Sequence, residues 1–242
     1  MLIVIQCFFY SYLYNIQLIY TNYFFEIPIV SIIFAEKDSL MIKNIVFDFG
    51  GVLVQYDFVG FFAKILGSRE QGEWFMENVL PHSINNDMDL EFHNFRYYIE
   101  QQQRLWPEYA EALDIFDKHY IDVFTTETEG IRDLILSLKS RGYRILGLSN
   151  WSSRVYEVID KFDVFNLIED SLISKDVHQL KPNKDIYESF LNKFHVKADE
   201  CVFIDDKPEN IEGCKTVGMN GIVFKNSKQL KQELDKLLQS VI

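Results

Sequence analysis

The sequence contains few cysteines and no cluster of positive charge, and these absences exclude several classes of protein. Its three cysteines, Cys7, Cys201 and Cys214, form neither a CxxC pair nor an even set. A disulfide-stabilised scaffold or a zinc site is therefore not expected. The net charge is −12, and Lys and Arg do not cluster. This argues against nucleic acid as the main partner, because a phosphate backbone is bound by grouped cations. A reducing, cytoplasmic location fits these features best.

The sequence also lacks a phosphate-binding loop of the P-loop type, a zinc-ligand motif, an internal repeat and a low-complexity tract. What it does have is a large hydrophobic fraction, 48% of 242 residues. A chain of this length and composition forms one large domain, or one domain with a sizeable insertion.

The first forty residues are hydrophobic, yet they fit neither a secretory signal nor a membrane span. No Lys or Arg precedes Lys37, so the basic region of a signal peptide is missing. Polar residues between Gln6 and Glu26 interrupt the segment and Pro28 divides it, whereas a span needs about 20 mostly apolar residues. We expect the native protein to start at Met41 and residues 1–40 to be an upstream extension. The alternatives are a membrane-associating segment and a genuine part of the fold.

From residue 41 onward, strand-like and helix-like patterns alternate. Strands are predicted at 45–47, 143–149, 201–205 and 221–224, with a short apolar run at 167–174, and helices at 129–139, 153–161, 184–194, 209–217 and the C-terminus. Such alternation predicts right-handed crossovers and a parallel sheet covered by helices on both faces. The expected fold is therefore α/β, a Rossmann-like arrangement of three layers.

The stretch from 58 to 124 interrupts this alternation, because it shows only helical spacing. Within it, Asp89 is predicted to cap a helix on which Phe92, Phe95 and Ile99 share one face. We therefore predict a core domain of residues 41–57 and 125–242 with an inserted all-helical cap domain of residues 58–124. Residues 54–57 and 125–128 are the expected hinges, and Thr128 is predicted to cap the helix that follows.

Polar residues stand at the ends of three predicted strands, and a lysine follows on a loop. They are Asp48, Ser149 with Asn150, Asp205 with Asp206, and Lys181. Each alone fits an ordinary turn residue. Because ligands bind beyond the carboxyl ends of parallel strands, the set together predicts a functional site at that edge of the sheet.

The motifs that carry these residues read "FDFGGVL", "LSN", "KPN" and "FIDDKPENI", in this order. They resemble the four motifs of the haloacid dehalogenase-like hydrolase superfamily, and the helical insertion resembles its smaller helical cap. The resemblance covers the chain from Met41 to the C-terminus. It is specific for the superfamily and says little about the substrate.

The resemblance implies Mg²⁺-dependent phosphoryl transfer to Asp48 as the nucleophile. The implied metal ligands are Asp48, the backbone carbonyl of Gly50 and Asp206, with Asp205 holding metal-bound water. Phosphate would be bound by Gly51, the Ser149 hydroxyl, the Asn150 backbone N–H and Lys181. Ser149 and Lys181 are also expected to act in catalysis, although Lys181 also fits a solvated loop lysine before Pro182.

One position departs from the family pattern. Most phosphatases of this superfamily carry a second aspartate two residues after the nucleophile, where it protonates the leaving oxygen, and here that position is Gly50. The same pattern occurs in bacterial sugar-1-phosphate phosphatases, whose leaving groups need less help. Asp57 and His82 are candidates for a substitute acid. Asp57 equally fits a hinge or helix-capping residue, and His82 a surface turn residue.

Three activities remain open at this point. A phosphatase acting on small phosphorylated metabolites such as sugar phosphates is the main prediction. A 2-haloacid dehalogenase would need no metal, and the acidic pair Asp205–Asp206 would then be a repulsive cluster without a purpose. A catalytically weak, phosphate-binding regulatory protein would gain nothing from Asp48. The oligomeric state stays open.

The cap should determine the substrate, and its aromatic and basic residues allow two interpretations. The aromatic residues are Trp74, Phe92, Phe95, Tyr97, Tyr98 and Trp106. They are expected mainly to form the core of the cap, with a substrate pocket as the alternative. Arg96 and Arg104 either meet a second anionic group of the substrate or face solvent.

Overall fold

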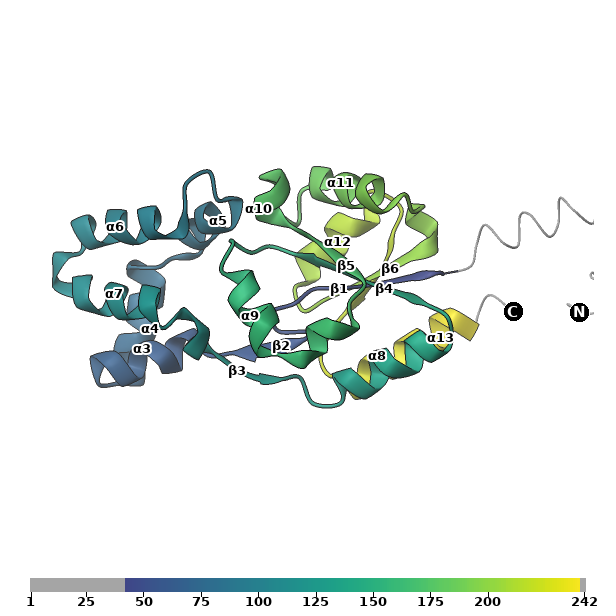
Figure 1. Ribbon diagram of the computed structural model, residues 1–242, viewed down its shortest axis with the longest axis horizontal. Helices are drawn as coiled ribbons and strands as arrows, with labels where there is room; N and C mark the ends of the chain where they lie inside the picture. The colour runs from purple at the N-terminus through teal and green to yellow at the C-terminus, as the bar shows by residue number, and fades with distance from the viewer. Residues whose placement is uncertain (1–41, 240–242) are drawn as a thin grey trace, which may run out of the picture. The chain divides into compact units, whose positions relative to one another are not determined.

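The computed structural model describes residues 42–239 (Figure 1). Five parallel strands form its central sheet in the order β5–β4–β1–β6–β7. Their bounds are β1 Asn44–Phe47, β4 Arg144–Ser149, β5 Asp170–Ile173, β6 Cys201–Asp205 and β7 Asn220–Val223. The parallel sheet confirms the predicted α/β fold.

Strand β1 lies in the middle of the sheet, and its residues alternate between two hydrophobic clusters. Ile45 and Phe47 belong to one cluster and Val46 to the other. Helices α8 (Ile131–Ser140), α9 (Val155–Lys161) and α13 (Ser227–Gln239) cover the first face. Helices α10 (Ser174–Val177), α11 (Lys184–Phe194) and α12 (Pro208–Lys215) cover the second (Figure 1). The sheet is therefore the middle of three layers, as predicted.

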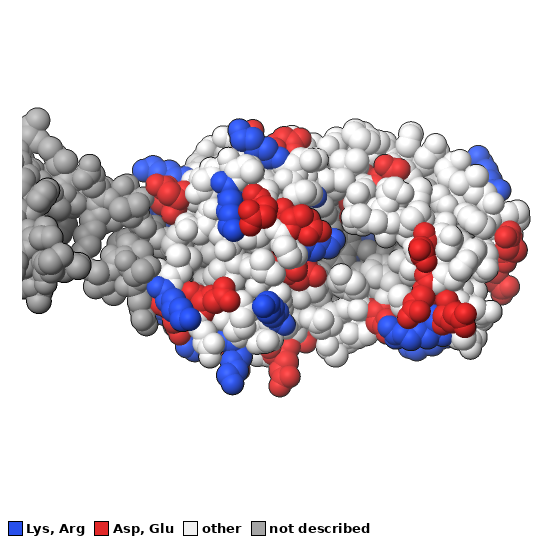
Figure 2. Space-filling view, turned by 180° about the vertical axis from the view of Figure 1, so that it is seen from behind, with Lys and Arg blue, Asp and Glu red and all other residues white. Residues whose placement is uncertain are grey.

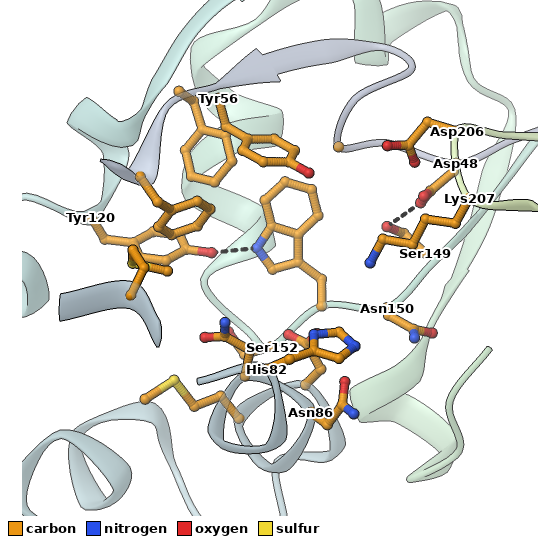
Figure 3. Close-up of a pocket in the computed structure, with 18 of the residues that line it drawn as sticks. Asp48, Tyr56, His82, Asn86, Tyr120, Ser149, Asn150, Ser152, Asp206 and Lys207 are labelled. Carbon is orange, nitrogen blue, oxygen red and sulfur yellow. Dashed lines mark hydrogen bonds between the residues drawn. The ribbon is translucent and has the colours of Figure 1, made fainter. Parts of the chain in front are cut away.

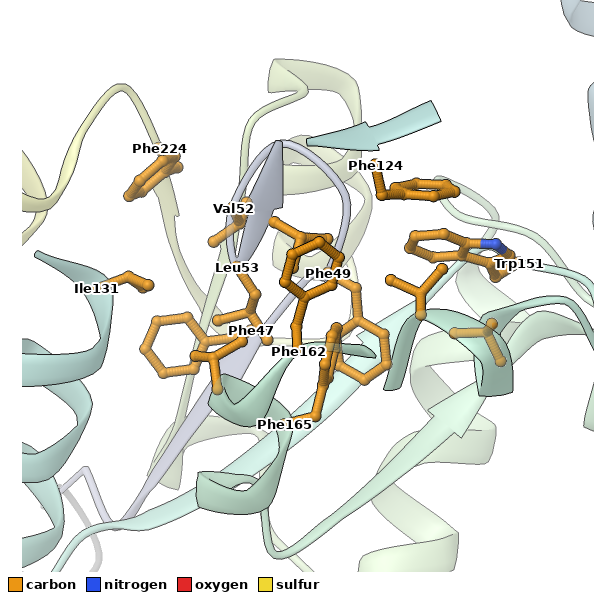
Figure 4. Packing of buried hydrophobic residues seen from close by; sticks show 14 of the residues in the cluster. Phe47, Phe49, Val52, Leu53, Phe124, Ile131, Trp151, Phe162, Phe165 and Phe224 are labelled. Carbon is orange, nitrogen blue, oxygen red and sulfur yellow. The ribbon is translucent and has the colours of Figure 1, made fainter. Parts of the chain in front are cut away.

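Aromatic packing fixes the turn that follows β1 (Figure 4). The ring of Phe49 packs edge-on against Phe165, with centroids 4.9 Å apart. A Cβ at Gly147 of β4 would lie 2.5 Å from Cε1 of Phe49, so the neighbouring strand must carry glycine there. Burial of one such ring contributes roughly 1.5–3 kcal/mol. Since Phe49 follows Asp48 directly, this packing also fixes the position of Asp48.

Residues 58–123 form helices and helical turns. The helices are α3 Phe58–Leu66, α4 Arg69–Asn78, α5 His82–Leu90, α6 Phe95–Leu105 and α7 Ala110–Lys118. Short 3₁₀ turns lie at Pro107–Tyr109 and Tyr120–Val123, and two more lie in the α/β part at Asp163–Leu167 and Ala198–Glu200. Phe62 and Phe75 stack at 4.1 Å, and Phe116 packs beside them. The helices of the block thus pack on one another through these rings, and the cluster continues into the core on the first face of the sheet.

Two helix starts differ from the prediction. Asp89 does not cap the helix that contains Phe95: it lies inside α5, and α6 begins at Phe95 with Asn94 as its cap. The Asn94 side chain accepts from the N–H of Tyr97, two residues into the helix. Thr128 does not cap α8 either, because that helix begins at Ile131 after Gly130, which has φ 72°.

The two segments predicted as hinges contain strands that the sequence did not suggest. Strand β2 (Val54–Tyr56) pairs antiparallel with β3 (Phe124–Glu127), with an irregularity in register between Gln55 and Tyr56. This two-stranded ribbon connects the α/β part to the helical block (Figure 1). The division into a core domain and a cap domain stays a prediction.

Among the described residues, no helix is long and apolar enough to cross a membrane. The predictions for residues 1–40 lie outside the described part of the chain, and the cytoplasmic location stays a prediction.

Candidate active site

The carboxyl ends of β1, β4 and β6 bring the predicted polar residues together. Asp48 follows β1, Ser149 ends β4 and Asp205 ends β6. Lys181 reaches them from the loop after α10, and its Nζ lies 2.9 Å from Asp48 Oδ1 and 2.7 Å from Asp205 Oδ2. All four side chains are buried. Lys181 is therefore an ion-paired lysine at the centre of the site, and the solvated alternative is wrong.

The two carboxylate oxygens of Asp48 have different surroundings. Its Oδ1 accepts from the Phe49 N–H at 2.7 Å, from Ser149 Oγ at 2.7 Å and from Lys181. Figure 3 shows the bond between Ser149 and Asp48 at the wall of the pocket. No residue of the described chain donates a hydrogen bond to Oδ2. The second oxygen thus keeps its lone pairs for a ligand.

Lys181 does not stabilise the ionised forms of Asp48 and Asp205 equally. Burial raises the pKa of Asp48 to about 7, and the charge of Asp205 adds to this rise while Lys181 opposes it. For Asp205, burial acts in the same direction, but Lys181 and donors from Lys207 and Asn210 outweigh it and lower the pKa. The pKa of Lys181 is raised because the two carboxylates outweigh its burial. One lysine thus faces two carboxylates, and a further positive charge would stabilise the site.

The donor set suits a hard divalent cation. Asp48, Asp205 and Asp206 can each offer a carboxylate oxygen within 4.8 Å of the others, and Mg²⁺ prefers such oxygen ligands. Gly51, three residues after Asp48, has φ 77°, and a Cβ at this position would lie 2.8 Å from Asp206 Oδ2. The bare backbone at Gly51 therefore leaves room for the Asp206 carboxylate. Gly50 lines the same pocket, and the role of its carbonyl stays a prediction.

Asn150 and Asn210 hold the charged residues in place, a function that the sequence did not reveal. The Asn150 side chain donates to the carbonyl of Lys181 at 3.0 Å and accepts from its N–H at 2.9 Å. Asn210, in α12, donates to both oxygens of Asp205 at 3.0 and 2.9 Å. Asn210 belongs to the same "FIDDKPENI" motif as the two aspartates, which is the signal in the sequence that indicates it.

A pocket of about 440 Å³ lies between these residues and the helical block. Helix α5 contributes His82, Asn85, Asn86 and Asp89 to its lining. Their spacing of three and four residues places them on one helix face, so they form a polar stripe. Figure 3 shows His82 and Asn86 on the side of α5, and Asp48, Ser149, Asp206 and Lys207 on another side.

The rest of the pocket is largely aromatic. Phe95, Phe116, Tyr120, Phe124 and Trp151 contribute to the wall. The Trp151 indole donates to the Tyr120 hydroxyl at 2.7 Å, which ties the loop after β4 to the helical block (Figure 3). On the outer surface, one face is hollowed between the helical block and the α/β part, with charged side chains of both signs at the edge of the hollow (Figure 2).

The candidates for a substitute acid have different positions. Asp57 caps α3 by accepting from the Gly60 N–H at 2.8 Å, and it also lines the pocket. His82 lines the pocket as the first residue of α5. A Cβ at Gly50 would lie 3.2 Å from Cε1 of Tyr56, so the Tyr56 ring fills the space beside the missing side chain.

Most of the cap residues considered for substrate binding lie elsewhere. Phe95 lines the pocket, whereas Trp74 packs with Trp106 and Tyr109, and Phe92 stacks on His178. Tyr97 and Tyr98 pack around His93. Arg96 pairs with Glu100, Asp114 and Asp117, and Arg104 is exposed. None of these residues except Phe95 contributes to the lining of the pocket.

An acidic, lysine-containing site at the carboxyl edge of a parallel sheet is the arrangement expected of an α/β hydrolase that uses a carboxylate. Residues 45–224 match the family described as haloacid dehalogenase-like hydrolase. The chain belongs to this family, as the resemblance predicted.

Comparisons with individual proteins agree. Flavin mononucleotide hydrolase 1 of Arabidopsis thaliana is 25% identical over 45% of this chain, and the match spans 44% of that relative, less than half its length. D-ribitol-5-phosphate phosphatase of Bacteroides thetaiotaomicron is 26% identical over 83% of this chain and 100% of its own length. A haloacid dehalogenase family enzyme of the same bacterium, in complex with magnesium and inorganic phosphate, superposes with a TM-score of 0.62. It is 20% identical over 77% of this chain and 96% of its own, so it supports the fold.

Proposed function

We propose that this hydrolase is a Mg²⁺-dependent phosphatase that acts on small phosphorylated metabolites through an aspartyl-phosphate on Asp48. The observation that carries the proposal is the group formed by the buried Asp48, Lys181 and Asp205 together with the half-buried Asp206. It pairs a carboxylate that has one free oxygen with a lysine and a candidate cation site. Phosphoryl transfer to a carboxylate needs these elements, because two anions must approach each other.

Each residue has a defined task in this reaction. Oδ2 of Asp48 attacks phosphorus, while Lys181 and the Ser149 hydroxyl turn from Asp48 to the phosphate oxygens. The backbone N–H of Asn150 binds the same phosphate. The N–H of Gly51 instead donates to the Val54 carbonyl at 2.8 Å, so the predicted role of Gly51 in phosphate binding is wrong. A magnesium ion held by Asp48, Asp206 and the Gly50 carbonyl, with Asp205 behind it, would supply charge neutralisation. The Asn150 side chain keeps the Lys181 loop in register.

The pocket supports a small, hydroxylated substrate of the sugar-phosphate type. Its volume of about 440 Å³ suits a metabolite. The polar stripe of His82, Asn85, Asn86 and Asp89 can donate to and accept from hydroxyl groups. Two relatives named for hydrolysing a flavin nucleotide and a polyol phosphate are compatible with this class.

The acidic cluster favours phosphate hydrolysis over dehalogenation. Displacement of halide from carbon needs no cation, and in that reaction Asp205 and Asp206 would only repel each other and Asp48. Burial, together with the Asp205 charge, raises the pKa of Asp206, and a bound cation would relieve this repulsion.

The proposal is tested by phosphate release from sugar phosphates, polyol phosphates, nucleotides and 4-nitrophenyl phosphate, with Mg²⁺ or with EDTA. We expect Mg²⁺-dependent release by the wild type and a loss of at least about a thousandfold in Asp48→Asn. Chloride release from 2-chloropropionate is followed in parallel. Metal-independent chloride release would establish a dehalogenase, and phosphate binding without any turnover would establish the regulatory alternative.

A further inference from the structure

The leaving oxygen of a phosphate ester needs a proton, and the residue that usually supplies it is absent at Gly50. The ring of Tyr56 fills the space beside Gly50, so no other acidic side chain replaces the missing one there. Tyr56 itself is a poor donor: burial and the nearby carboxylates of Asp206, Asp48 and Asp205 raise the pKa of its hydroxyl to about 12. The proton must come from another wall of the pocket.

Asp89 is the carboxyl group that α5 presents to this pocket. It is the fourth member of the polar stripe, and it makes no ion pair within the described part of the chain. The backbone N–H of Ser152, three residues beyond Ser149, lies close enough to favour the ionised carboxylate and to lower its pKa slightly against the effect of burial. Asp57, the other pocket aspartate of the helical region, is exposed and already caps α3.

The backbone around Asp89 is fixed to the α/β part by three contacts. Ser174 Oγ donates to the Asp89 carbonyl at 2.7 Å, and His178 Nδ1 lies 2.6 Å from the Leu90 carbonyl. The Glu91 carboxylate accepts from Ser153 N–H and Oγ at 2.7 and 2.6 Å. Asp89 is thus held at a fixed place relative to Asp48, although it belongs to the helical block.

The charges that face Asp89 come from several elements. Burial is the largest influence and raises its pKa to about 7; Lys207 and Lys181 oppose this, and Asp48 adds to it. The Tyr120 hydroxyl also lies close enough for the Asp89 charge to raise its pKa. A carboxyl group in such surroundings is protonated in part of the molecules at neutral pH, the state that an acid catalyst needs.

On the basis of the proposed phosphatase activity, we propose that Asp89 is the proton donor to the leaving oxygen, in place of the side chain missing at Gly50. As the Asp48 Oδ2–phosphorus bond forms and the phosphorus–ester oxygen bond breaks, the ester oxygen takes the proton of Asp89 and leaves as an alcohol. Water then enters where the alcohol stood. It gives a proton to the Asp89 carboxylate, its oxygen bonds to phosphorus, and Asp48 is released with inorganic phosphate.

The test compares esters with different leaving groups. Asp89→Asn retains the size and an acceptor oxygen of the side chain but carries no ionisable proton. We expect it to lower kcat/KM for an alkyl phosphate, such as ribitol 5-phosphate, by about 10²–10⁴-fold. With 4-nitrophenyl phosphate, whose leaving group needs no proton, the first step should stay within a few-fold of wild type. Nitrophenolate should then appear as a burst equal to the enzyme concentration, followed by slow turnover. Asp89→Glu should restore part of the alkyl activity.

Matched controls separate this role from a structural one. Asp87→Asn changes an exposed aspartate of the same helix that does not line the pocket, and it should behave as wild type with both esters. An equal loss on both esters in Asp89→Asn, or no loss on either, would overturn the proposal. So would a selective loss of alkyl activity in Tyr56→Phe instead. The proposed function fails separately, if the wild type releases no phosphate from any ester in Mg²⁺.

Discussion

At the scale of single residues, the two glycines after Asp48 have different physical roles. Gly51 has φ 77°, a conformation that residues with a side chain rarely adopt, and it lies against the Asp206 carboxylate. Gly50 has no such backbone requirement, and its nearest neighbour is the ring of Tyr56, which is 41% exposed and can move. The backbone conformation thus requires glycine at position 51, whereas at position 50 only the nearby Tyr56 ring disfavours a side chain.

Alanine substitutions at the two positions should therefore differ. We expect Gly51→Ala to lower the free energy of unfolding by about 1–3 kcal/mol, because it combines backbone strain with a clash against Asp206. Gly50→Ala should cost less than about 1 kcal/mol. Urea unfolding of both variants measures this, and equal costs would contradict the assignment.

The titration of Asp89 should make the stability of the protein depend on pH. Asp89 has a folded-state pKa of about 7 against an ordinary value of 3.8, so between these values the folded protein binds more protons than the unfolded chain. Stability contributed by its neutral form is therefore lost as pH rises from about 4 to about 7. Asp89→Asn removes this loss. The free energy of unfolding of the variant minus that of wild type should therefore be about 1–3 kcal/mol larger at pH 8 than at pH 4. This range allows for the partial exposure of Asp89.

Unfolding midpoints of wild type and Asp89→Asn at several pH values provide the measurement. Lys207, Lys181, Asp48 and Tyr120 face Asp89 in both proteins, so the difference between the two curves isolates this carboxyl group. A difference that does not change with pH would show that Asp89 titrates normally.

The sequence revealed the part of the site that lies at strand ends. Asp48, Ser149 and Asp205 could be predicted because parallel strands end at one edge, and Lys181 because its motif accompanies them. Asp89 could not be predicted as a site residue, because an aspartate before an amphipathic stretch also fits a helix cap. Only the packing of α5 turns Asp89 toward the pocket. The roles assigned to these residues remain predictions.

At the scale of elements, the end of α5 forms the contact between the helical block and the loops after β4 and β5. Glu91 ends the helix with φ 48° and accepts two hydrogen bonds from Ser153. Hydrogen bonds to a charged group contribute about 1.5–3 kcal/mol where they are shielded from water. This contact is therefore expected to hold the helical block over the site.

Removal of the contact should weaken substrate binding. Glu91→Ala is expected to raise KM about tenfold with a smaller change in kcat. It removes the hydrogen bonds to Ser153 that hold the helical block over the site, and an arrangement in which the block has moved away lacks these bonds in any case. Glu91→Gln keeps an acceptor and should lie in between. Glu77→Ala, at an exposed position of α4, is the control. Unchanged KM in Glu91→Ala would show that this contact does not govern closure.

The secondary structure could be predicted where the pattern of apolar residues was long enough to define a helix face or a buried strand. Helix α11 and strand β6 lie at the predicted residues, because each has a complete apolar face or a continuous apolar run. The ribbon of β2 and β3 was missed, since three and four residues are too few to establish a period. Its existence depends on pairing between segments that are far apart in the chain, as between Gln55 and Thr126.

At the scale of the whole molecule, a bound cation should stabilise the fold. Asp48, Asp205 and Asp206 repel one another, and a ligand that binds only the folded state adds RT ln(1 + [L]/Kd) to its stability. At about 100 times Kd, Mg²⁺ would add about 2.7 kcal/mol, a rise in Tm of several degrees for a protein of this size.

Thermal unfolding in EDTA and in increasing Mg²⁺ tests this expectation. Asp206→Asn should lose the Mg²⁺-dependent rise while its Tm in EDTA stays equal to or above that of wild type, since one repulsive charge is gone. Asp199→Asn, an exposed aspartate beside β6, is the control. A full Mg²⁺ response in Asp206→Asn would exclude Asp206 as a ligand.

A phosphoryl group on Asp48 during turnover can be detected directly. Wild type and Asp89→Asn are mixed with 4-nitrophenyl phosphate and Mg²⁺, quenched in acid within the first turnover, and mapped by peptide mass spectrometry. We predict one phosphoryl group on the peptide that contains Asp48, absent in EDTA and more abundant in Asp89→Asn. Phosphate release without any modified peptide, or a phosphoryl group on another residue, would contradict the account.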